Sequence, residues 1–144
     1  MRLASRLGAA LTAAACWAAP AEACTIGTTA VAFGQYDPRS ATPDDGVGSV
    51  TLNCSAFRSA SVSMSTGSGT YLQRKMTSGT NTLNYNLYTT STRTIVWGNG
   101  TSGSSIVPLA RNFTGTITVY GRIPAGQNVR AGTYTDTVTV TVTF

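Results

Sequence analysis

Histidine is absent from this 144-residue chain and carboxylates are few, with 5 Asp and Glu residues against 10 Lys and Arg. These groups are the commonest general bases and metal ligands in proteins. Their scarcity argues against hydrolytic and metal-dependent enzymes, so we expect no catalytic residues, no metal and no cofactor. The formal net charge is only +5, and Arg74-Lys75 is the only adjacent basic pair. Nucleic-acid binding normally needs a concentrated basic patch, so we also expect no nucleic-acid partner.

Residues 1–23 have the pattern of a secretory signal peptide. Arg2 and Arg6 precede an apolar run over residues 7–19, and Ala21-Glu22-Ala23 places small residues where signal peptidase cuts. The run is shorter than the roughly 20 apolar residues of a transmembrane helix, so we expect no membrane span in the mature chain. Cleavage after Ala21 fits the same pattern, and a lipoprotein cut before Cys24 is a third interpretation.

Two cysteines, Cys24 and Cys54, remain after removal of such a peptide. In an oxidising compartment a disulfide is the default state of two cysteines. Their spacing differs from the close CxxC arrangement of redox-active pairs. We therefore predict a structural Cys24–Cys54 disulfide within one domain of residues 24–144.

Apolar and polar residues alternate with a period of two along this domain, as is typical of half-buried β-strands. The clearest run is 133–144, where Val138, Val140, Val142 and Phe144 share one face and threonines occupy the other. Shorter runs of this kind cover residues 25–33, 48–54, 59–65, 83–89, 94–97 and 115–123. About seven short strands between turn signals predict an all-β, antiparallel immunoglobulin-like sandwich, with an up-and-down barrel as the alternative.

The last predicted strand carries no charge and no proline after Asp136. Soluble monomers usually blunt or cover such an edge. An uncovered apolar edge can instead pair with a strand from a partner. Val138, Val140, Val142 and Phe144 are therefore candidates for a partner-binding edge, and an ordinary strand paired internally is the alternative.

Six segments of the domain carry a resemblance to a known family. They are 32–38 (AFGQYDP), 74–76 (RKM), 83–88 (LNYNLY), 97–101 (WGNGT), 119–127 (VYGRIPAGQ) and 131–136 (AGTYTD). In this order they resemble the spore coat protein U domain, the subunit family of archaic, Csu-type chaperone–usher pili. The resemblance extends over the whole predicted domain.

The resemblance implies an incomplete immunoglobulin-like sandwich that lacks its last strand and is completed by a donor strand. It implies a non-enzymatic subunit of a surface fibre or spore-type coat, in transit through the periplasm. The implied partners are a periplasmic PapD-like chaperone, which grips the last strand, an outer-membrane usher and other pilus or coat subunits. A stand-alone secreted binding module or tip adhesin of the same fold is the alternative.

Polymerising members of the family carry an alternating apolar segment before their first cysteine. Here the predicted cleavage site adjoins Cys24 directly. A donor segment needs several residues of about 3.3 Å each, so we expect this chain to accept a strand without giving one. Such a chain would be a terminal or capping subunit, or a coat component that does not polymerise by strand exchange. The alternative is that the start codon or the cleavage site lies elsewhere and part of residues 7–20 is retained as the donor.

Tyr85, Tyr88 and Trp97 are candidate residues for aromatic contacts with a ligand at the surface. Alternate aromatic residues in a strand more often pack in a core, and Trp97 before a Gly-Asn-Gly turn also fits a core anchor.

Overall fold

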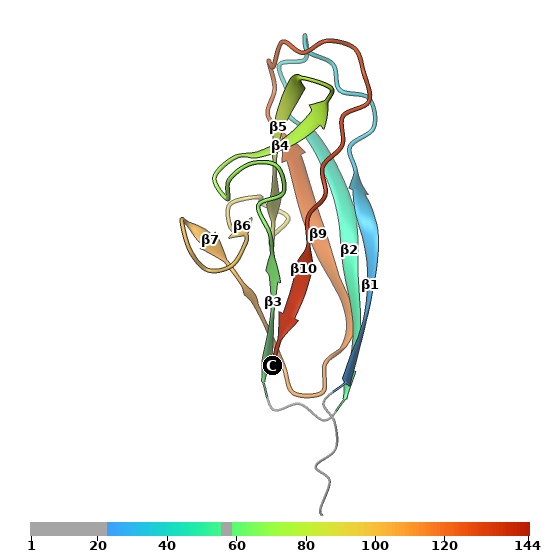
Figure 1. Cartoon of the computed structure of the whole chain (residues 1–144), viewed down its shortest axis with the longest axis vertical. Coiled ribbons are helices and arrows are strands. Elements are labelled where there is room, and N and C mark those ends of the chain that lie inside the picture. Colours follow the sequence, from blue (N-terminus) through green and yellow to red (C-terminus); the bar gives the residue numbers. More distant parts are fainter. Residues whose placement is uncertain (1–22, 56–58) are drawn as a thin grey trace, which may run out of the picture.

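The computed structural model describes residues 23–55 and 59–144, which form β-strands and loops without a helix (Figure 1). The strands are β1 (Ala23–Ala32), β2 (Asp44–Ser55), β3 (Ala60–Met64), β4 (Arg74–Ser78), β5 (Asn81–Tyr88), β6 (Val96–Trp97), β7 (Ser104–Ser105), β8 (Val107–Leu109), β9 (Thr114–Ile123) and β10 (Val140–Thr143). The expected all-β class is confirmed. The predicted signal peptide lies outside the described residues, apart from its last residue. No helix that could cross a membrane occurs in the described part of the chain.

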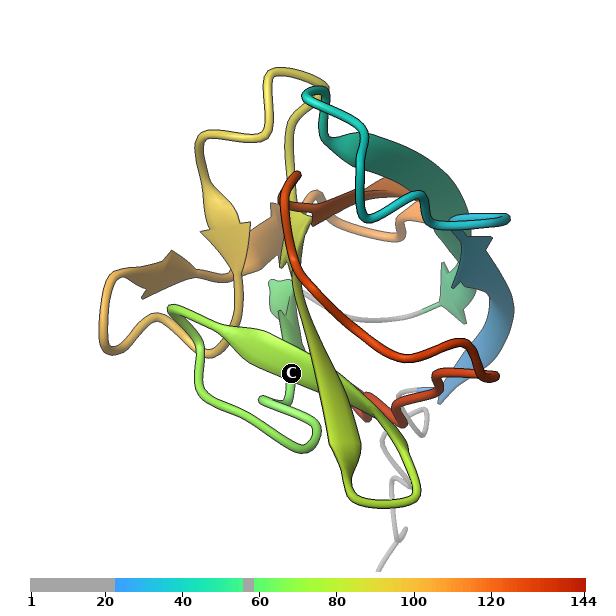
Figure 2. The same ribbon diagram turned by 90° about the horizontal axis from the view of Figure 1, so that it is seen from above.

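The strands form two sheets that pack face to face and do not close into a barrel. The larger sheet has the order β1-β2-β9-β5-β6-β7, with β4 paired to β5, and the smaller has the order β10-β3-β8. All pairings are antiparallel except that between β6 and β7. Seen from above, β1 and β2 curve around one flank, and β6 and β7 project on the opposite flank (Figure 2). The predicted sandwich is therefore confirmed.

The core lies between the sheets and is built from the alternate residues of each strand. In β3 every second residue is buried, and Val62 is fully enclosed. Trp97 is 0% exposed, and its indole Nε1 donates to the Val62 carbonyl oxygen at 3.1 Å, which ties β6 to β3. The opposite face of the larger sheet is rich in hydroxyls, as in the 3.0 Å hydrogen bond between Thr51 and Thr116.

Glycines on β2 and β9 make room for the end of β1 and the residues after it. A Cβ at Gly121 would lie 2.6 Å from the side chains of both Val31 and Phe33. A Cβ at Gly46 would lie 3.0 Å from each of these side chains, and one at Gly48 would lie 2.8 Å from Val31. A β-bulge between Thr29 and Ala32 shifts the register just before this contact. Val31 and Phe33 thereby pack onto the core and hold the upper end of β1 against its own sheet.

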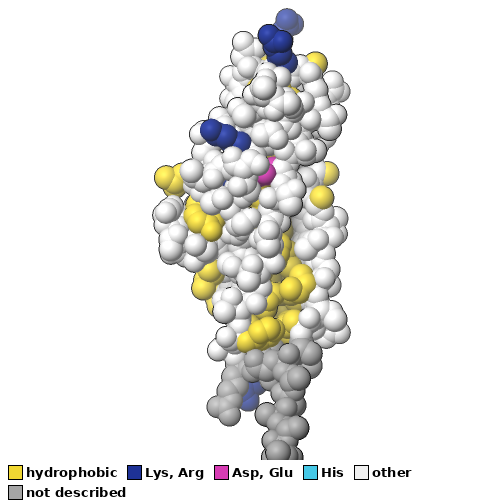
Figure 3. All heavy atoms as spheres, in the orientation of Figure 1, with side chains coloured by type: hydrophobic (Ala, Val, Ile, Leu, Met, Phe, Trp, Pro, Cys, Tyr) yellow, Lys and Arg dark blue, Asp and Glu magenta, His cyan; other side chains and the backbone are white. Residues whose placement is uncertain are grey.

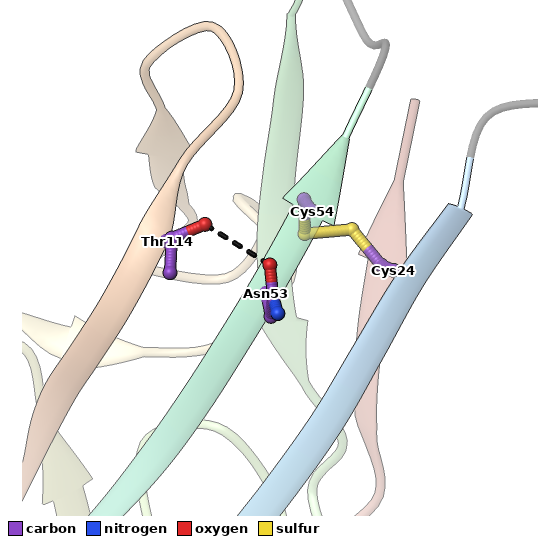
Figure 4. The surroundings of a disulfide bond; sticks show 4 residues. All are labelled: Cys24, Asn53, Cys54 and Thr114. Atoms are coloured by element: carbon purple, nitrogen blue, oxygen red, sulfur yellow. Dashed lines mark hydrogen bonds between the residues drawn. A yellow bond between two sulfur atoms is a disulfide. The ribbon is translucent and has the colours of Figure 1, made fainter.

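The lower end of β1 is held by the Cys24–Cys54 disulfide, as predicted (Figure 4). The two cysteines are opposite each other in the β1–β2 register. On the other face of the sheet the Thr114 hydroxyl donates to the Asn53 side chain at 3.1 Å. That bond joins β9 to β2, whereas β1 is fixed to β2 by the disulfide and by the hydrogen bonds of the β1–β2 ladder.

The C-terminal run is only in part a paired strand, which corrects the expectation of one continuous strand over residues 133–144. β10 starts at Val140, and residues 136–139 form no regular ladder. Upstream, Thr135 makes a single bridge to Thr77. The predicted alternation of faces nevertheless holds, because Tyr134, Val138, Val140 and Val142 all pack against the core.

Candidate functional site

Each sheet ends in an open strand edge. β1 pairs only with β2, and β10 pairs only with β3, among the residues that the structure describes. Ser65 N donates to the Thr139 carbonyl at 2.9 Å, so Thr139 bonds toward β3. Successive residues of a strand direct their amides to opposite sides. The amides of Val138, Val140 and Val142 therefore point away from β3, toward the open side.

A groove of about 420 Å³ lies between these edges. One wall is Thr28–Val31 of β1, and the other is the C-terminal segment 134–140. The floor is formed by core residues of both sheets, namely Val50, Met64, Met76, Tyr85, Leu87 and Val119. Figure 3 shows hydrophobic side chains uncovered between the C-terminal segment and β1 in the lower half of the molecule. We call this feature the edge groove.

Residues on the core side of the groove walls remain partly open to solvent. Ile26 is directly opposite Leu52 in the β1–β2 register, so both side chains share the core face. Leu52 is 0% exposed, whereas Ile26 is 45% exposed. Val138, Val140 and Val142 pack against the core but are only half-buried, and Phe144 is 50% exposed. Apolar surface directed to the interior is therefore left partly bare on both edge strands, at Ile26 of β1 outside the groove lining and at Val138 and Val140 of the C-terminal wall.

A second hollow of about 740 Å³ continues the groove upward beneath residues 129–134. The two spaces share Val31, Phe33, Met76 and Tyr134 in their linings. The covering loop is tied down by Gln127, whose side chain accepts from Asn84 N at 2.8 Å and donates to Asn84 O at 2.9 Å. The edge groove thus continues into a chamber lined by apolar and aromatic residues.

Beneath one wall of the groove lies a buried polar cluster centred on Arg74, which is 0% exposed. Its guanidinium donates to Asn86 Oδ1 at 2.6 Å, to the Trp97 carbonyl at 2.7 Å and twice to the Ser65 carbonyl, at 2.8 and 3.1 Å. Burial lowers the pKa of Arg74. All of these acceptors are neutral, so the cluster joins β4, β5, β6 and the β3–β4 loop through one charged side chain.

Asp136 connects the C-terminal segment to the same region. Its carboxylate accepts from the Tyr85 hydroxyl at 2.7 Å and from Ser68 N and Oγ at 3.0 and 2.9 Å. Burial, and then the hydrogen bond to Asp136, raises the pKa of Tyr85 above the ordinary value of a tyrosine. No local sequence pattern indicates these contacts of Asp136, because Ser68 and Tyr85 lie 68 and 51 residues away.

The candidate edge residues and the candidate aromatic residues have different environments. Val138, Val140 and Val142 face the groove side as the alternation predicts. Tyr85 is 5% exposed and Trp97 is 0% exposed, so neither can contact a ligand at the surface, which corrects that hypothesis in favour of core packing. Tyr88 is half-buried. The three aromatic residues therefore do not form a surface contact site.

On the outer face, Asp45 is paired with two arginines. Asp45 accepts a bidentate hydrogen bond from Arg122 at 2.7 and 2.9 Å and lies 3.2 Å from Arg93. The Arg122 hydrogen bond, with a smaller effect from the charge of Arg93, holds the pKa of Asp45 below its usual value. No cluster of three metal-ligating side chains occurs in the described part of the chain. The edge groove is the candidate functional site.

Comparison with known proteins agrees with this architecture. The family model of the spore coat protein U domain matches residues 9–141. The chain belongs to the spore coat protein U domain family. Protein U of Myxococcus xanthus is 39% identical over 142 residues, a match that covers 85% of this chain and 78% of that protein.

A solved structure with the same fold is the CsuC-CsuE chaperone–tip adhesion subunit pre-assembly complex from the archaic chaperone–usher Csu pili of Acinetobacter baumannii. A chain of that complex matches this spore coat protein U domain with a TM-score of 0.59 and 25% sequence identity. The match covers 85% of this chain and 40% of that chain, so the domain spans less than half of its structural neighbour.

Proposed function

We propose that this chain is a structural subunit of a chaperone–usher surface fibre or coat, and that a partner's β-strand completes its sandwich at the edge groove. The observation that carries the proposal is the pair of open edges, β1 and the C-terminal segment, on either side of an apolar groove. A strand inserted there would pair its backbone with both edges and place alternate side chains on the core.

The bare core surface supports this proposal energetically. Side chains such as Ile26 and Val140 already face the interior, so an inserted strand would cover them without rearranging either sheet. Covering apolar surface contributes about 25 cal/mol per Å². A subunit with such a groove would need protection before assembly, because an exposed apolar edge promotes aggregation.

That need fits the proposed route of export. The domain would be secreted by the signal peptide of residues 1–23 and held in the periplasm by a PapD-like chaperone. It would then pass through an outer-membrane usher to the cell surface. The structural neighbour, a chaperone–tip adhesion subunit complex, supports a chaperone as the first occupant of the groove.

The test is strand binding by the full exported chain. A synthetic peptide of about twelve residues that alternates Val and Thr supplies one apolar face at about 3.3 Å per residue. We expect a one-to-one complex, with stability raised by about 2.7 kcal/mol at a peptide concentration a hundred times the Kd. A control peptide of the same composition with Val and Thr in pairs breaks the alternation. Equal binding of both peptides, or of neither, would contradict the proposal.

A tip adhesin is the second candidate, because the structural neighbour includes a tip adhesion subunit. Immunogold labelling of this chain in intact fibres distinguishes a position in the shaft from a position at the tip. Label along the whole fibre indicates a shaft subunit, and label confined to the fibre end indicates a tip subunit.

A further inference from the structure

Residues 134–138 form the upper part of the C-terminal wall of the edge groove, which we call the upper wall. Few backbone hydrogen bonds hold this segment to the rest of the fold. Thr135 exchanges two hydrogen bonds with Thr77, at 2.8 and 3.1 Å. The next attachment is at Thr139, which bonds Ser65 through its carbonyl and its amide. Between these points no residue is paired in a ladder, although Asp136 and Val138 line the groove.

The carboxylate of Asp136 bridges this gap. Oδ1 accepts from Ser68 N, Ser68 Oγ and Thr137 N at 3.0, 2.9 and 2.9 Å, and Oδ2 accepts from the Tyr85 hydroxyl at 2.7 Å. These donors belong to the β3–β4 loop, to β5 and to the wall itself. Hydrogen bonds to an ionised acceptor are about twice as strong as those between neutral groups. One side chain therefore takes the place of a missing stretch of ladder.

Gly67 and Arg74 provide space and a favourable charge near the Asp136 carboxylate. Gly67 has a φ of 60°, and a Cβ at this position would collide with the Asp136 carboxylate. Arg74 has only neutral hydrogen-bond acceptors, and the charge of Asp136 opposes the lowering of its pKa by burial. The negative charge of Asp136 thus makes a small favourable contribution to the buried charge of Arg74.

We propose that Asp136 is a positioning residue for strand acceptance: it holds residues 134–138 in place, so that the upper part of the edge groove is formed before a strand enters. This inference rests on the proposed function. A preformed wall lowers the ordering cost of binding, whereas a slack wall must be ordered by the incoming strand. Without the carboxylate, a strand would still pair with β10 but would bind the upper wall weakly.

The test uses Asp136→Asn, in which the amide NH₂ meets the donors of Ser68 or Tyr85. The matched control is Asp37→Asn, because Asp37 is exposed, lines neither the edge groove nor the second hollow, and accepts a hydrogen bond from the Arg39 amide. Two quantities are measured for each variant: its affinity for the alternating Val/Thr peptide, and the amide hydrogen exchange of its complex with that peptide. We expect Asp136→Asn to weaken binding by roughly tenfold or more, corresponding to one charge-assisted hydrogen bond. Asp37→Asn should bind as the wild type does.

Hydrogen exchange distinguishes a positioning role from general destabilisation. In the Asp136→Asn complex, peptide-induced protection should persist along residues 140–143 and disappear along residues 134–138. Tyr85→Phe removes one of the four bonds and should give the same pattern more weakly, which keeps the test decisive if Asp136→Asn folds poorly. Uniform loss along both segments, or unchanged affinity and protection, would overturn the positioning role alone. Failure of the wild type to bind the peptide would overturn the proposed function, and the inference with it.

Discussion

Val140 offers a direct test of which face of the C-terminal strand receives a partner. It is half-buried, lines the edge groove and lies opposite buried Met64 on β3. Its neighbour Thr139 is exposed on the other face. A carboxylate at these adjacent positions should therefore have very different effects on strand binding.

In the free subunit the groove is open to water, so the carboxylate of Val140→Asp remains hydrated. The cost is then mainly the lost burial of half a valine, about 1 kcal/mol. When a strand fills the groove, the same carboxylate is desolvated, at an effective cost of several kcal/mol. A cost of about 3 to 4 kcal/mol corresponds to a hundred- to a thousandfold loss of affinity. Thr139→Asp should change stability by no more than about 0.5 kcal/mol and affinity only slightly.

The measurements are urea unfolding of each free variant and fluorescence anisotropy of the labelled alternating peptide. Because burial disfavours the charged form, the affinity of Val140→Asp should also recover as the pH falls below about 5. Equal affinity of Val140→Asp and Thr139→Asp for the peptide would contradict the placement of Val140 on the face that a strand covers. A loss of folding stability in Val140→Asp as large as its loss of binding free energy would contradict it too.

Three further variants test the framework around the groove. Arg74→Lys should lower the free energy of unfolding by about 2 to 4 kcal/mol in urea titrations, because an ammonium cannot reproduce the planar fork and leaves buried acceptors unsatisfied. Replacing Cys24 and Cys54 by alanine removes a cross-link with a sequence separation of 30. Chemical unfolding should then show a loss of about 3 to 4 kcal/mol. Burial and the hydrogen bond to Asp136 raise the folded-state pKa of Tyr85, so its contribution to stability is complete below the ordinary tyrosine pKa of 10.0 and is lost as the pH rises above that value. Tyr85→Phe should therefore flatten the fall in the urea midpoint between about pH 9 and 11.

The period-two pattern predicted side-chain faces more reliably than strand pairing. Along residues 133–144 the alternation correctly placed Val138, Val140 and Val142 on the core side. It could not show that the ladder begins only at Val140, because a ladder also needs a partner strand alongside. A pattern of side chains reports which surface is buried, whereas hydrogen bonding depends on neighbours that are distant in the sequence.

The sequence pattern indicated neither β4 nor the contact between Asp136 and Ser68, because both depend on polar residues. β4 was not among the predicted strands, since it begins with Arg74-Lys75, yet Arg74 is fully buried. A buried arginine requires several converging acceptors, and these come from three separate elements here. The Asp136 contact with Ser68 was hidden for the same reason. Single-sequence reasoning lacks the spatial information that such clusters require.

The two walls of the groove are each fixed to their own sheet. β1 is bound to β2 by its ladder and the Cys24–Cys54 disulfide, and Val31 and Phe33 press its upper end onto the glycines of β2 and β9. The opposite wall is bound to β3 by the β10 ladder and to the β3–β4 loop by Asp136. Apolar walls without such supports would tend to collapse together and bury their exposed surface. Supports that bind each wall to its own sheet oppose that collapse, so they leave the groove open for a strand from another molecule.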